Sequence, residues 1–157
     1  MFFFVHVMAK EMKIALLQYN FTIGDLSGNA VKIRKGYEDA VKHGADLVVS
    51  TELALFGYPP RDLLERHDLI EEQLEILAVL AYGVGDVPLI VGVAERNPDN
   101  AGKPLFNGAA VLRDGKIETI RRKSLLPAYD VFDEYRYFEP YTQVQKPVVI
   151  NGKNSGF

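Results

Sequence analysis

Two short apolar runs flank an amphipathic stretch near the start of the chain. Residues 13–18 and 46–50 are apolar and partly β-branched, which is typical of buried strands. Residues 30–43, between them, have the pattern of a helix with one apolar side. A strand, a helix and a second strand in about 35 residues predict a βαβ unit with parallel strands and a right-handed crossover.

The helix expected over residues 30–43 follows a turn-rich loop. Ser27 or Asn29 is the candidate N-cap, and Gly44 is the candidate C-terminal stop. The side of this helix that we expect to be buried contains Val31, Tyr37, Ala40 and Val41.

A loop, a second helix and a third strand come next. Residues 52–61 include the sequence Gly-Tyr-Pro-Pro, which excludes regular structure. Residues 68–82 repeat apolar positions at helical spacing, and residues 88–94 form another apolar strand. The buried face of the second helix should contain Ile70, Leu74, Leu77 and Ala81.

The second half of the chain changes character. Residues 107–113 and 116–122 predict two strands, and Asp-Gly between them is a strong signal for a two-residue hairpin. Residues 123–142 are aromatic and irregular, and residues 148–150 form a last strand. The pattern indicates an α/β fold whose late strands have little helix to cover them. We therefore expect an incomplete domain with apolar surface that is exposed or covered by a partner chain.

Composition narrows the class of protein. The chain has 157 residues, of which 48% are hydrophobic and 25% charged, as in one globular domain. The formal net charge of −3 gives no basic footprint, so we expect no nucleic-acid or membrane partner and a cytoplasmic location. The absence of cysteine excludes disulfides and cysteine-ligated metals. No metal site is expected from His6, His43 and His67, which lack metal-ligand spacing.

Residues 1–12 are interpreted as an N-terminal extension, and residues 13–157 as the domain. The opening has a short apolar stretch, but it lacks the basic segment and small-residue cleavage site of a signal peptide. Because the regular pattern begins only at residue 13, Met1, Met8 and Met12 are all candidate starts.

Two charged residues stand just after expected strands, where ligands bind in sheets of this kind. Glu52 follows the second strand and has the chemistry of a general base. Lys123 follows the strand at residues 116–122 and can keep a carboxylate ionised or stabilise an oxyanion. Taken alone, either residue is also explained as an exposed surface charge. If both are functional, they should lie together at one edge of the sheet.

The loops after Glu52 and Lys123 contain most of the candidate pocket residues. Aromatic side chains in loops over a sheet end can wall a small pocket. Ordinary packing of the loops onto the core explains them equally well. These aromatic residues are Tyr58, Tyr129, Phe132, Tyr135, Tyr137 and Phe138.

Three segments together resemble the nitrilase superfamily of carbon–nitrogen hydrolases. Residues 52–64, ELALFGYPPRDLL, resemble its glutamate motif in the version of the glutaminase domains of glutamine-dependent NAD synthetases. Residues 123–140, KSLLPAYDVFDEYRYFEP, resemble its lysine motif, and residues 14–29 resemble its opening. The resemblance covers residues 13–157, and the lysine motif is long and specific.

The resemblance implies a fold, a reaction and a set of site residues. The fold would be an αββα sandwich, of which this chain is the incomplete N-terminal part. The reaction would be hydrolysis of the side-chain amide of glutamine through a cysteine thioester. Position by position, the resemblance implies that Glu52 is the general base, Lys123 stabilises the oxyanion and Glu134 is an additional catalytic carboxylate. It also places Tyr58 and Tyr129 close to the bound glutamine.

The resemblance also implies partners. Ammonia would pass to a separate synthetase domain, absent here, that uses ATP and Mg to amidate nicotinic acid adenine dinucleotide. Assembly into homo-oligomers is expected, and no cofactor is expected in this chain itself.

The nucleophilic cysteine of the family would follow a turn that residues 151–157 resemble. We therefore expect a chain truncated before its nucleophile and inactive alone. Two alternatives stay open: a piece of another carbon–nitrogen hydrolase, such as an ω-amidase-like enzyme, and a non-catalytic module for binding or assembly.

Overall fold

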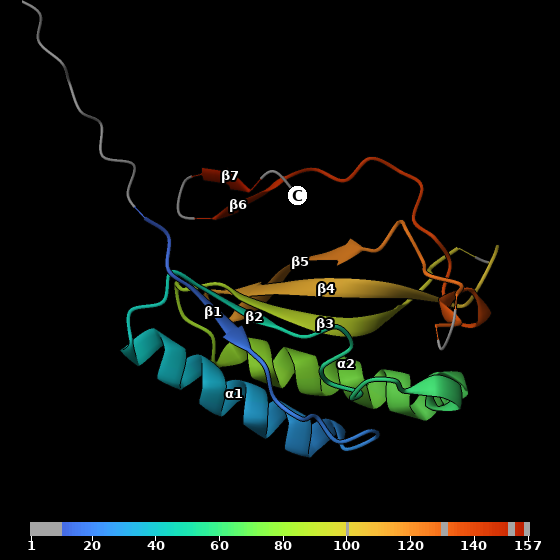
Figure 1. Cartoon of the computed structure of the whole chain (residues 1–157), viewed down its shortest axis with the longest axis horizontal. Helices are drawn as coiled ribbons and strands as arrows, with labels where there is room; N and C mark the ends of the chain where they lie inside the picture. The colour runs from blue at the N-terminus through green and yellow to red at the C-terminus, as the bar shows by residue number, and fades with distance from the viewer. Residues whose placement is uncertain (1–10, 100, 130–131, 151–152, 156–157) are drawn as a thin grey trace, which may run out of the picture.

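A five-stranded mixed sheet organises the molecule (Figure 1). The computed structural model describes residues 11–99, 101–129, 132–150 and 153–155. Strands β1 to β3 are parallel, and β4 and β5 continue the sheet antiparallel, in the order β1-β2-β3-β4-β5. This arrangement confirms the predicted βαβ unit and hairpin. The strands are β1 (Ile14–Leu17), β2 (Leu47–Ser50), β3 (Leu89–Arg96), β4 (Leu105–Arg113) and β5 (Lys116–Arg122).

Some predictions concern residues outside the described parts of the chain. Residues 1–10 of the expected N-terminal extension, including His6, are among them, and so is the turn at residues 151–152. The first regular element, β1, begins at Ile14, where the apolar pattern begins.

Two helices cover one face of the sheet: α1 (Leu26–Lys42) and α2 (His67–Tyr82). Ile33 of α1 and Leu77 of α2 are fully buried against strand residues such as Val91. Burying an aliphatic side chain of this size contributes roughly 1.5–3 kcal/mol. This layer therefore fixes the helices on the sheet and, with them, the loops at the strand ends.

The start of α1 differs from the prediction. The helix begins at Leu26, four residues earlier than expected, and its cap is Asp25, whose Oδ1 accepts a hydrogen bond from the Gly28 N–H at 2.9 Å. Neither Ser27 nor Asn29 is the N-cap. Asn29 is instead buried, and its side-chain amide donates to the Thr22 and Leu55 carbonyls at 2.8 and 2.9 Å. Ser27, Gly28 and Asn29 are residue types that suggest a loop, but all three lie within the helix.

The buried side of α1 was predicted only in part. Tyr37 is buried, and Ala40 and Val41 pack against the core, but Val31 is 66% exposed. Ile33 marks the side that faces the sheet, and residues two apart on a helix do not share a face. The predicted stop is confirmed, since Gly44 follows the helix C-cap.

The second helix matches its predicted bounds closely. Ile70, Leu77 and Ala81 are buried as expected, whereas Leu74 is only partly buried. The buried Gln73 was not predicted; its amide donates to the Ala94 carbonyl at 2.6 Å and accepts from the Ala94 N–H at 2.9 Å. Strand β2 pairs with β3 only as far as Ile90. Beyond that point, the Gln73 side chain takes the place of a neighbouring strand and bonds the backbone N–H and carbonyl of Ala94.

The hairpin between β4 and β5 has the predicted turn. Asp114 and Gly115 have φ values of 51° and 76°, the left-handed conformation that a two-residue turn of this type requires. The long loops contain two short 3-10 helices, η1 (Arg61–Glu65) and η2 (Glu134–Arg136).

The opposite face of the sheet carries β6 (Val148–Ile150) and β7 (Lys153–Ser155), which form a separate antiparallel hairpin (Figure 1). Val148 and Ile150 pack against Leu47 and Val111 of the sheet. In the described parts of the chain, no helix lies on this face. Val149 of β6 is 42% exposed, as expected for late strands without helical cover. Ile14 and Leu16 of the first strand, β1, are exposed as well, which the sequence did not predict.

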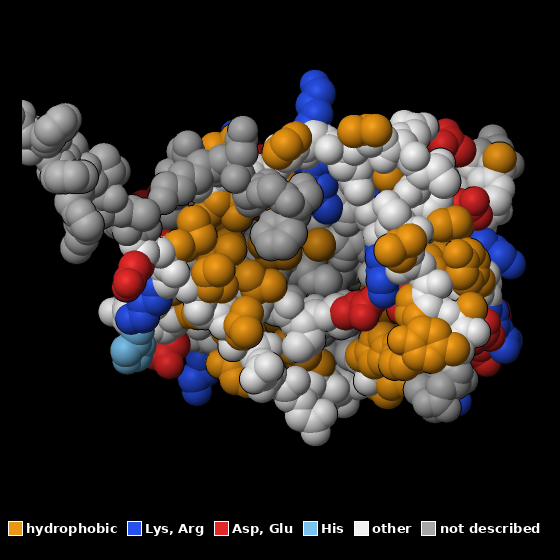
Figure 2. Space-filling view, turned by 45° about the horizontal axis from the view of Figure 1, so that its top comes forward, with side chains coloured by type: hydrophobic (Ala, Val, Ile, Leu, Met, Phe, Trp, Pro, Cys, Tyr) orange, Lys and Arg blue, Asp and Glu red, His pale blue; other side chains and the backbone are white. Residues whose placement is uncertain are grey.

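Apolar surface is visible from this side of the molecule. Figure 2 shows apolar side chains gathered there, beside a hollow where acidic and basic side chains meet. Within the described part of the chain, none of the helices has the length and apolar character needed to span a membrane.

Candidate active site

One edge of the sheet brings three polar residues together. Glu52 follows the carboxyl end of β2, and Lys123 follows that of β5. Asn107 lies near the start of β4, opposite Ala94 at the end of β3. Because β4 is antiparallel to both neighbours, its start lies at the same edge as the carboxyl ends of β3 and β5. This topology explains why residues far apart in sequence meet.

An ion cluster forms at this edge. The Lys123 ammonium donates to Glu52 Oε1 at 2.7 Å, and to Glu134 Oε1 and Oε2 at 2.9 and 3.0 Å. The side chains of Glu52, Lys123 and Glu134 are 39%, 32% and 7% exposed. The predicted proximity of Glu52 and Lys123 is confirmed, and Glu134 joins them. Nearly complete burial of the Glu134 carboxylate makes the lysine its necessary counter-charge.

The protonation of Lys123 follows from these contacts. Partial burial by itself lowers the pKa of the lysine, but hydrogen bonds and charge from Glu52 and Glu134 outweigh it, so the pKa is raised above its usual value. Lys123 is therefore a cation throughout the neutral pH range, able to stabilise negative charge.

Close backbone packing sets the position of Glu52. The segment from Thr51 to Leu53 crosses β3 at Gly92, where a Cβ atom would lie 2.4 Å from both the Leu53 nitrogen and the Thr51 oxygen. Only glycine allows this approach. The next residue, Leu53, is buried and has a φ of 46°, an uncommon value for a residue with a side chain. Such strain persists only where the surrounding structure enforces it.

Packing of the loop that follows β5 places Glu134. Phe138 is buried in the same apolar cluster as Leu53 and forms an isolated bridge with Leu105. The Phe138 N–H donates to the Glu134 carbonyl at 2.9 Å. The loop is thus anchored to β4 beside the ion cluster.

Asn107 is the site residue that sequence reasoning missed. It is buried, and its amide contacts both Glu52 and Glu134. The available signal was a polar residue inside an otherwise apolar strand. A buried amide almost always has hydrogen-bond partners, so that signal predicts a polar neighbour across the sheet.

A hollow of about 360 Å³ opens beside the cluster on the sheet face away from α1 and α2. Its walls combine β-strand backbone with charged side chains. Its lining includes Ser50, Glu52, Gly92, Asn107, Arg121 and Lys123. A small polar ligand here would meet both the carboxylate and the ammonium group.

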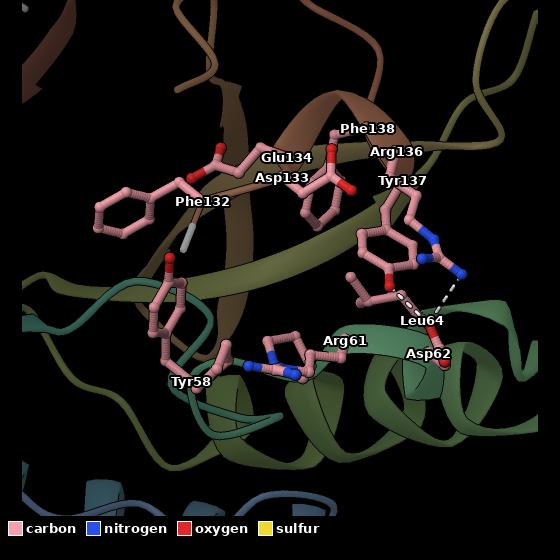
Figure 3. Close-up of a pocket in the computed structure, with 12 residues that line it drawn as sticks. Tyr58, Arg61, Asp62, Leu64, Phe132, Asp133, Glu134, Arg136, Tyr137 and Phe138 are labelled. Atoms are coloured by element: carbon pink, nitrogen blue, oxygen red, sulfur yellow. Dashed lines mark hydrogen bonds and ion pairs between the residues drawn. The ribbon is translucent and has the colours of Figure 1, made fainter. Parts of the chain in front are cut away.

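A second cavity, of about 260 Å³, lies between the two aromatic loops (Figure 3). Tyr58, Phe132 and Glu134 line it, as the aromatic-loop hypothesis predicts. Burial raises the pKa of the Tyr58 hydroxyl, and the charges of Glu52 and Glu134 raise it further against the opposing charge of Lys123. Tyr58 therefore lies within electrostatic reach of the whole ion cluster.

Tyr129 does not share this position. It is 69% exposed and is not among the residues that line the cavity beside Tyr58. Its ring packs edge-on against Phe132, with the ring centroids 5.6 Å apart. The prediction that both tyrosines wall one cavity is therefore wrong in this structure. A loop sequence specifies that aromatic residues are present, but not which of them turns inward.

The far side of the cavity is fixed by polar contacts. The Tyr137 hydroxyl donates to Asp62 Oδ1 at 2.6 Å, and Arg136 forms an ion pair with the same oxygen at 3.3 Å. These bonds join η1 to η2 across the cavity. Within the described residues, no cluster of three or more His, Asp and Glu side chains could hold a metal ion.

Tyr137 should titrate late. Desolvation and the hydrogen bond to Asp62 raise its pKa to about 12. A raised pKa means that the folded chain keeps the phenol proton longer than the unfolded chain does. Its contribution to stability is therefore present below about pH 10 and lost between about pH 10 and 12. Phenolate absorbance at alkaline pH measures this titration.

Two variants assign the late titration. Tyr137→Phe should remove the last component of the absorbance curve, and Asp62→Asn should move it toward lower pH. A curve that Tyr137→Phe leaves unchanged at its alkaline end would show that the Tyr137–Asp62 bond is absent in solution.

The sequence of this chain matches a known protein family. The family described as "Carbon-nitrogen hydrolase" matches residues 13–155. Glutamine-dependent NAD(+) synthetase from Xylella fastidiosa is 41% identical over 133 residues, covering 84% of this chain and 24% of that protein. The protein of the same name from Synechocystis is 43% identical over 132 residues, covering 80% of this chain and 23% of its own length. The chain thus spans about a quarter of the length of these relatives.

Solved structures have the same fold. Glutamine-dependent NAD+ synthetase from Acinetobacter baumannii superposes with a TM-score of 0.80 at 33% identity, over 90% of this chain and 26% of that one. An amidase from Nesterenkonia superposes with a TM-score of 0.69 at 22% identity, over 88% of this chain and 51% of that one. The second likeness shows the shared nitrilase fold alone, and the first adds sequence similarity to it.

Proposed function

Because this chain belongs to the carbon–nitrogen hydrolase family, we propose that it forms part of a glutaminase site that supplies ammonia for NAD synthesis. The observation that carries the proposal is the contact of Lys123 with both Glu52 and Glu134 at one sheet edge. A base and a fixed cation within one hydrogen bond of each other suit amide hydrolysis. The resemblance to glutamine-dependent NAD synthetases supports glutamine as the amide.

The proposed chemistry divides the roles. An amide is a poor electrophile and needs a strong nucleophile, and the 157 residues contain no cysteine. A thiol from polypeptide outside these residues would lose its proton to Glu52 and attack the amide carbon. The Lys123 ammonium would stabilise the oxyanion as the carbonyl bond opens. When the C–N bond breaks, Glu52 returns the proton to the leaving ammonia, and water then hydrolyses the thioester with Glu52 again as base.

Other residues have supporting roles in the proposal. Glu134 keeps Lys123 charged and in place, since it contacts the ammonium through both oxygens. Tyr58 would contact the glutamine from the cavity that it lines. Tyr129 is exposed, so it would contact the glutamine only if its loop turned inward when substrate binds.

The remaining parts of the activity lie with the rest of a synthetase. Ammonia would pass to an ATP- and Mg-dependent domain that amidates nicotinic acid adenine dinucleotide, in a homo-oligomeric cytoplasmic enzyme. The similarity to longer proteins, of which the matched residues cover 24% and 22%, supports this arrangement.

A chimaera tests the proposal. Residues 13–155 would replace the matching segment of the Xylella fastidiosa synthetase, which supplies the remainder of a full-length protein. We expect the chimaera to release ammonia from glutamine. The 157-residue chain alone should release ammonia only at a residual rate, because base and lysine cannot replace a covalent nucleophile. Loss of the nucleophile leaves only about 10³–10⁴-fold catalysis over water in comparable triads.

Two outcomes would contradict the proposal. Robust turnover by the 157-residue chain would place the nucleophile within it. A folded chimaera that releases no ammonia, while the parent synthetase does, would favour a non-catalytic role or a different amide substrate.

A further inference from the structure

The neighbouring carboxylates of Glu52 and Glu134 determine which way the Asn107 side-chain amide points. Its Nδ2 atom lies 2.6 Å from Glu52 Oε1 and 3.3 Å from Glu134 Oε2. An amide oxygen turned toward these carboxylates would face acceptors only, whereas the amide nitrogen offers two N–H donors. The nitrogen therefore faces the carboxylates, and each N–H has its own acceptor.

The hydrogen bonds leave the two carboxylates unequal. Both oxygens of Glu134 accept from Lys123, and Oε2 also accepts from Asn107. Glu52 Oε1 accepts from both Lys123 and Asn107. Within the described part of the chain, no donor contacts Glu52 Oε2. One of the four carboxylate oxygens is thus left without a donor, and it belongs to the residue that lines the hollow beside the sheet.

Asn107 also holds the lysine. Its backbone carbonyl accepts from the Lys123 N–H at 2.8 Å, so one residue fixes the lysine backbone and both partners of the lysine side chain. Burial within β4 leaves the Asn107 amide little freedom to turn away. The residue thus connects all three charged groups without carrying a charge itself.

We propose that Asn107 is a positioning residue that makes Glu52 Oε2 the proton-accepting oxygen of the cluster. It engages Glu52 through Oε1 and adds a third hydrogen bond to Glu134, both of whose oxygens already accept from Lys123, so Glu134 serves as a counter-ion and Glu52 as the base. The proton-transfer part of this inference rests on the proposed glutaminase function. The hydrogen-bond part does not, and it can be measured without turnover.

The first test uses the unaltered chain. In ¹⁵N-correlated NMR spectra, the two Asn107 side-chain protons should have widely separated shifts, the one bonded to Glu52 being shifted furthest downfield. Both should exchange slowly with solvent. Glu52→Gln should move mainly one proton signal and Glu134→Gln mainly the other. Degenerate, rapidly exchanging signals in the unaltered chain would overturn the inference whatever the variants do.

The second test removes the amide donors. Asn107→Leu should raise the pKa of Lys123 further, because both carboxylates lose a neutral donor that tempers their negative charge. Asn107→Asp should raise it more, because it adds a third carboxylate. Asn29→Asp is the matched control, since Asn29 is equally buried but its side chain bonds only backbone groups in the loops that follow β1 and β2. It should lower stability and leave the Lys123 pKa unchanged.

The outcomes separate positioning from packing. Asn107→Leu could lower stability and leave the Lys123 pKa unchanged, as the Asn29→Asp control should. In that case Asn107 contributes only packing, and the inference fails. In the chimaera, Asn107→Ser should lower kcat on the order of 10²-fold with KM little changed, as expected for a displaced catalytic group. A folded but inactive chimaera together with the expected NMR signals would count against the glutaminase function but not against the hydrogen-bond assignment.

Discussion

Ammonia release by the chimaera should fall by about 10²–10⁴-fold when Glu52 is replaced by glutamine, the range that general acid–base catalysis contributes. Glutamine has the same shape and still accepts a hydrogen bond from Lys123, so the loss would come from the missing base. The measurement is kcat for glutamine hydrolysis by the chimaera and by Glu52→Gln at one pH.

A second carboxylate serves as the control for this substitution. Glu118 is 31% exposed and forms an ion pair with Arg113 at 2.6 Å, far along β5 from the site. Glu118→Gln removes a comparable charge and should leave kcat within about twofold, because Glu118 pairs with Arg113 and not with the ion cluster. Its effect on stability should be only about 0–1 kcal/mol, as for other exposed ion pairs. If Glu52→Gln and Glu118→Gln have equal kcat values, Glu52 is not the base.

Gly92→Ala should have the largest effect on stability among the glycine substitutions of this edge. The added methyl group would meet the backbone of Thr51 and Leu53 at 2.4 Å, and neither backbone atom can move without displacing the loop. We expect a loss of about 3 kcal/mol in the free energy of unfolding, the upper part of the usual range for overpacking. Urea unfolding followed by circular dichroism measures it.

Gly85→Ala is the matched control. Its Cβ would meet nothing closer than the Tyr37 hydroxyl at 3.8 Å, an ordinary contact, so stability should change little. In the chimaera, Gly92→Ala should also lower turnover, because the displaced loop carries Glu52. Equal unfolding free energies for the two variants would show that the loop does not rest on Gly92 in solution.

The sequence predicted where Glu52 and Lys123 lie because the ends of strands are local signals. An apolar run placed β2 and the hairpin signal placed β5, so Glu52 and Lys123 could be assigned to strand ends. Because β4 is antiparallel to both β3 and β5, β5 runs in the same direction as β2 and β3, and the ends of β2 and β5 lie at one edge. The hairpin at Asp114 was equally local, since its turn depends on two residues. Glu134 was different: only the resemblance singled it out, because a carboxylate in an irregular loop has no pattern of its own.

The features that were not predicted correctly from the sequence share a physical cause: each depends on contacts with distant parts of the chain or on the exact start of a helix. Asn107 acquires its role from partners 55 and 27 residues away, which no local window contains. The cap of α1 was misplaced because Ser27 and Gly28 lie within the helix instead of before it. For Tyr129, loop packing decides which aromatic ring turns inward, and that choice depends on tertiary contacts.

The way in which Gln73 bonds to Ala94 has a consequence for association between molecules. Where β2 ends, β3 would present unpaired backbone groups, the kind of edge that recruits a strand from another chain and begins aggregation. Gln73 occupies both groups of Ala94, and the Ser50 hydroxyl accepts from the Gly92 N–H at 3.2 Å. The side chains of Gln73 and Ser50 thus occupy backbone groups of β3 that a strand from another molecule would otherwise bind. Strand β2 can therefore end at Ser50, and the chain that carries Glu52 can turn away from the sheet at that point.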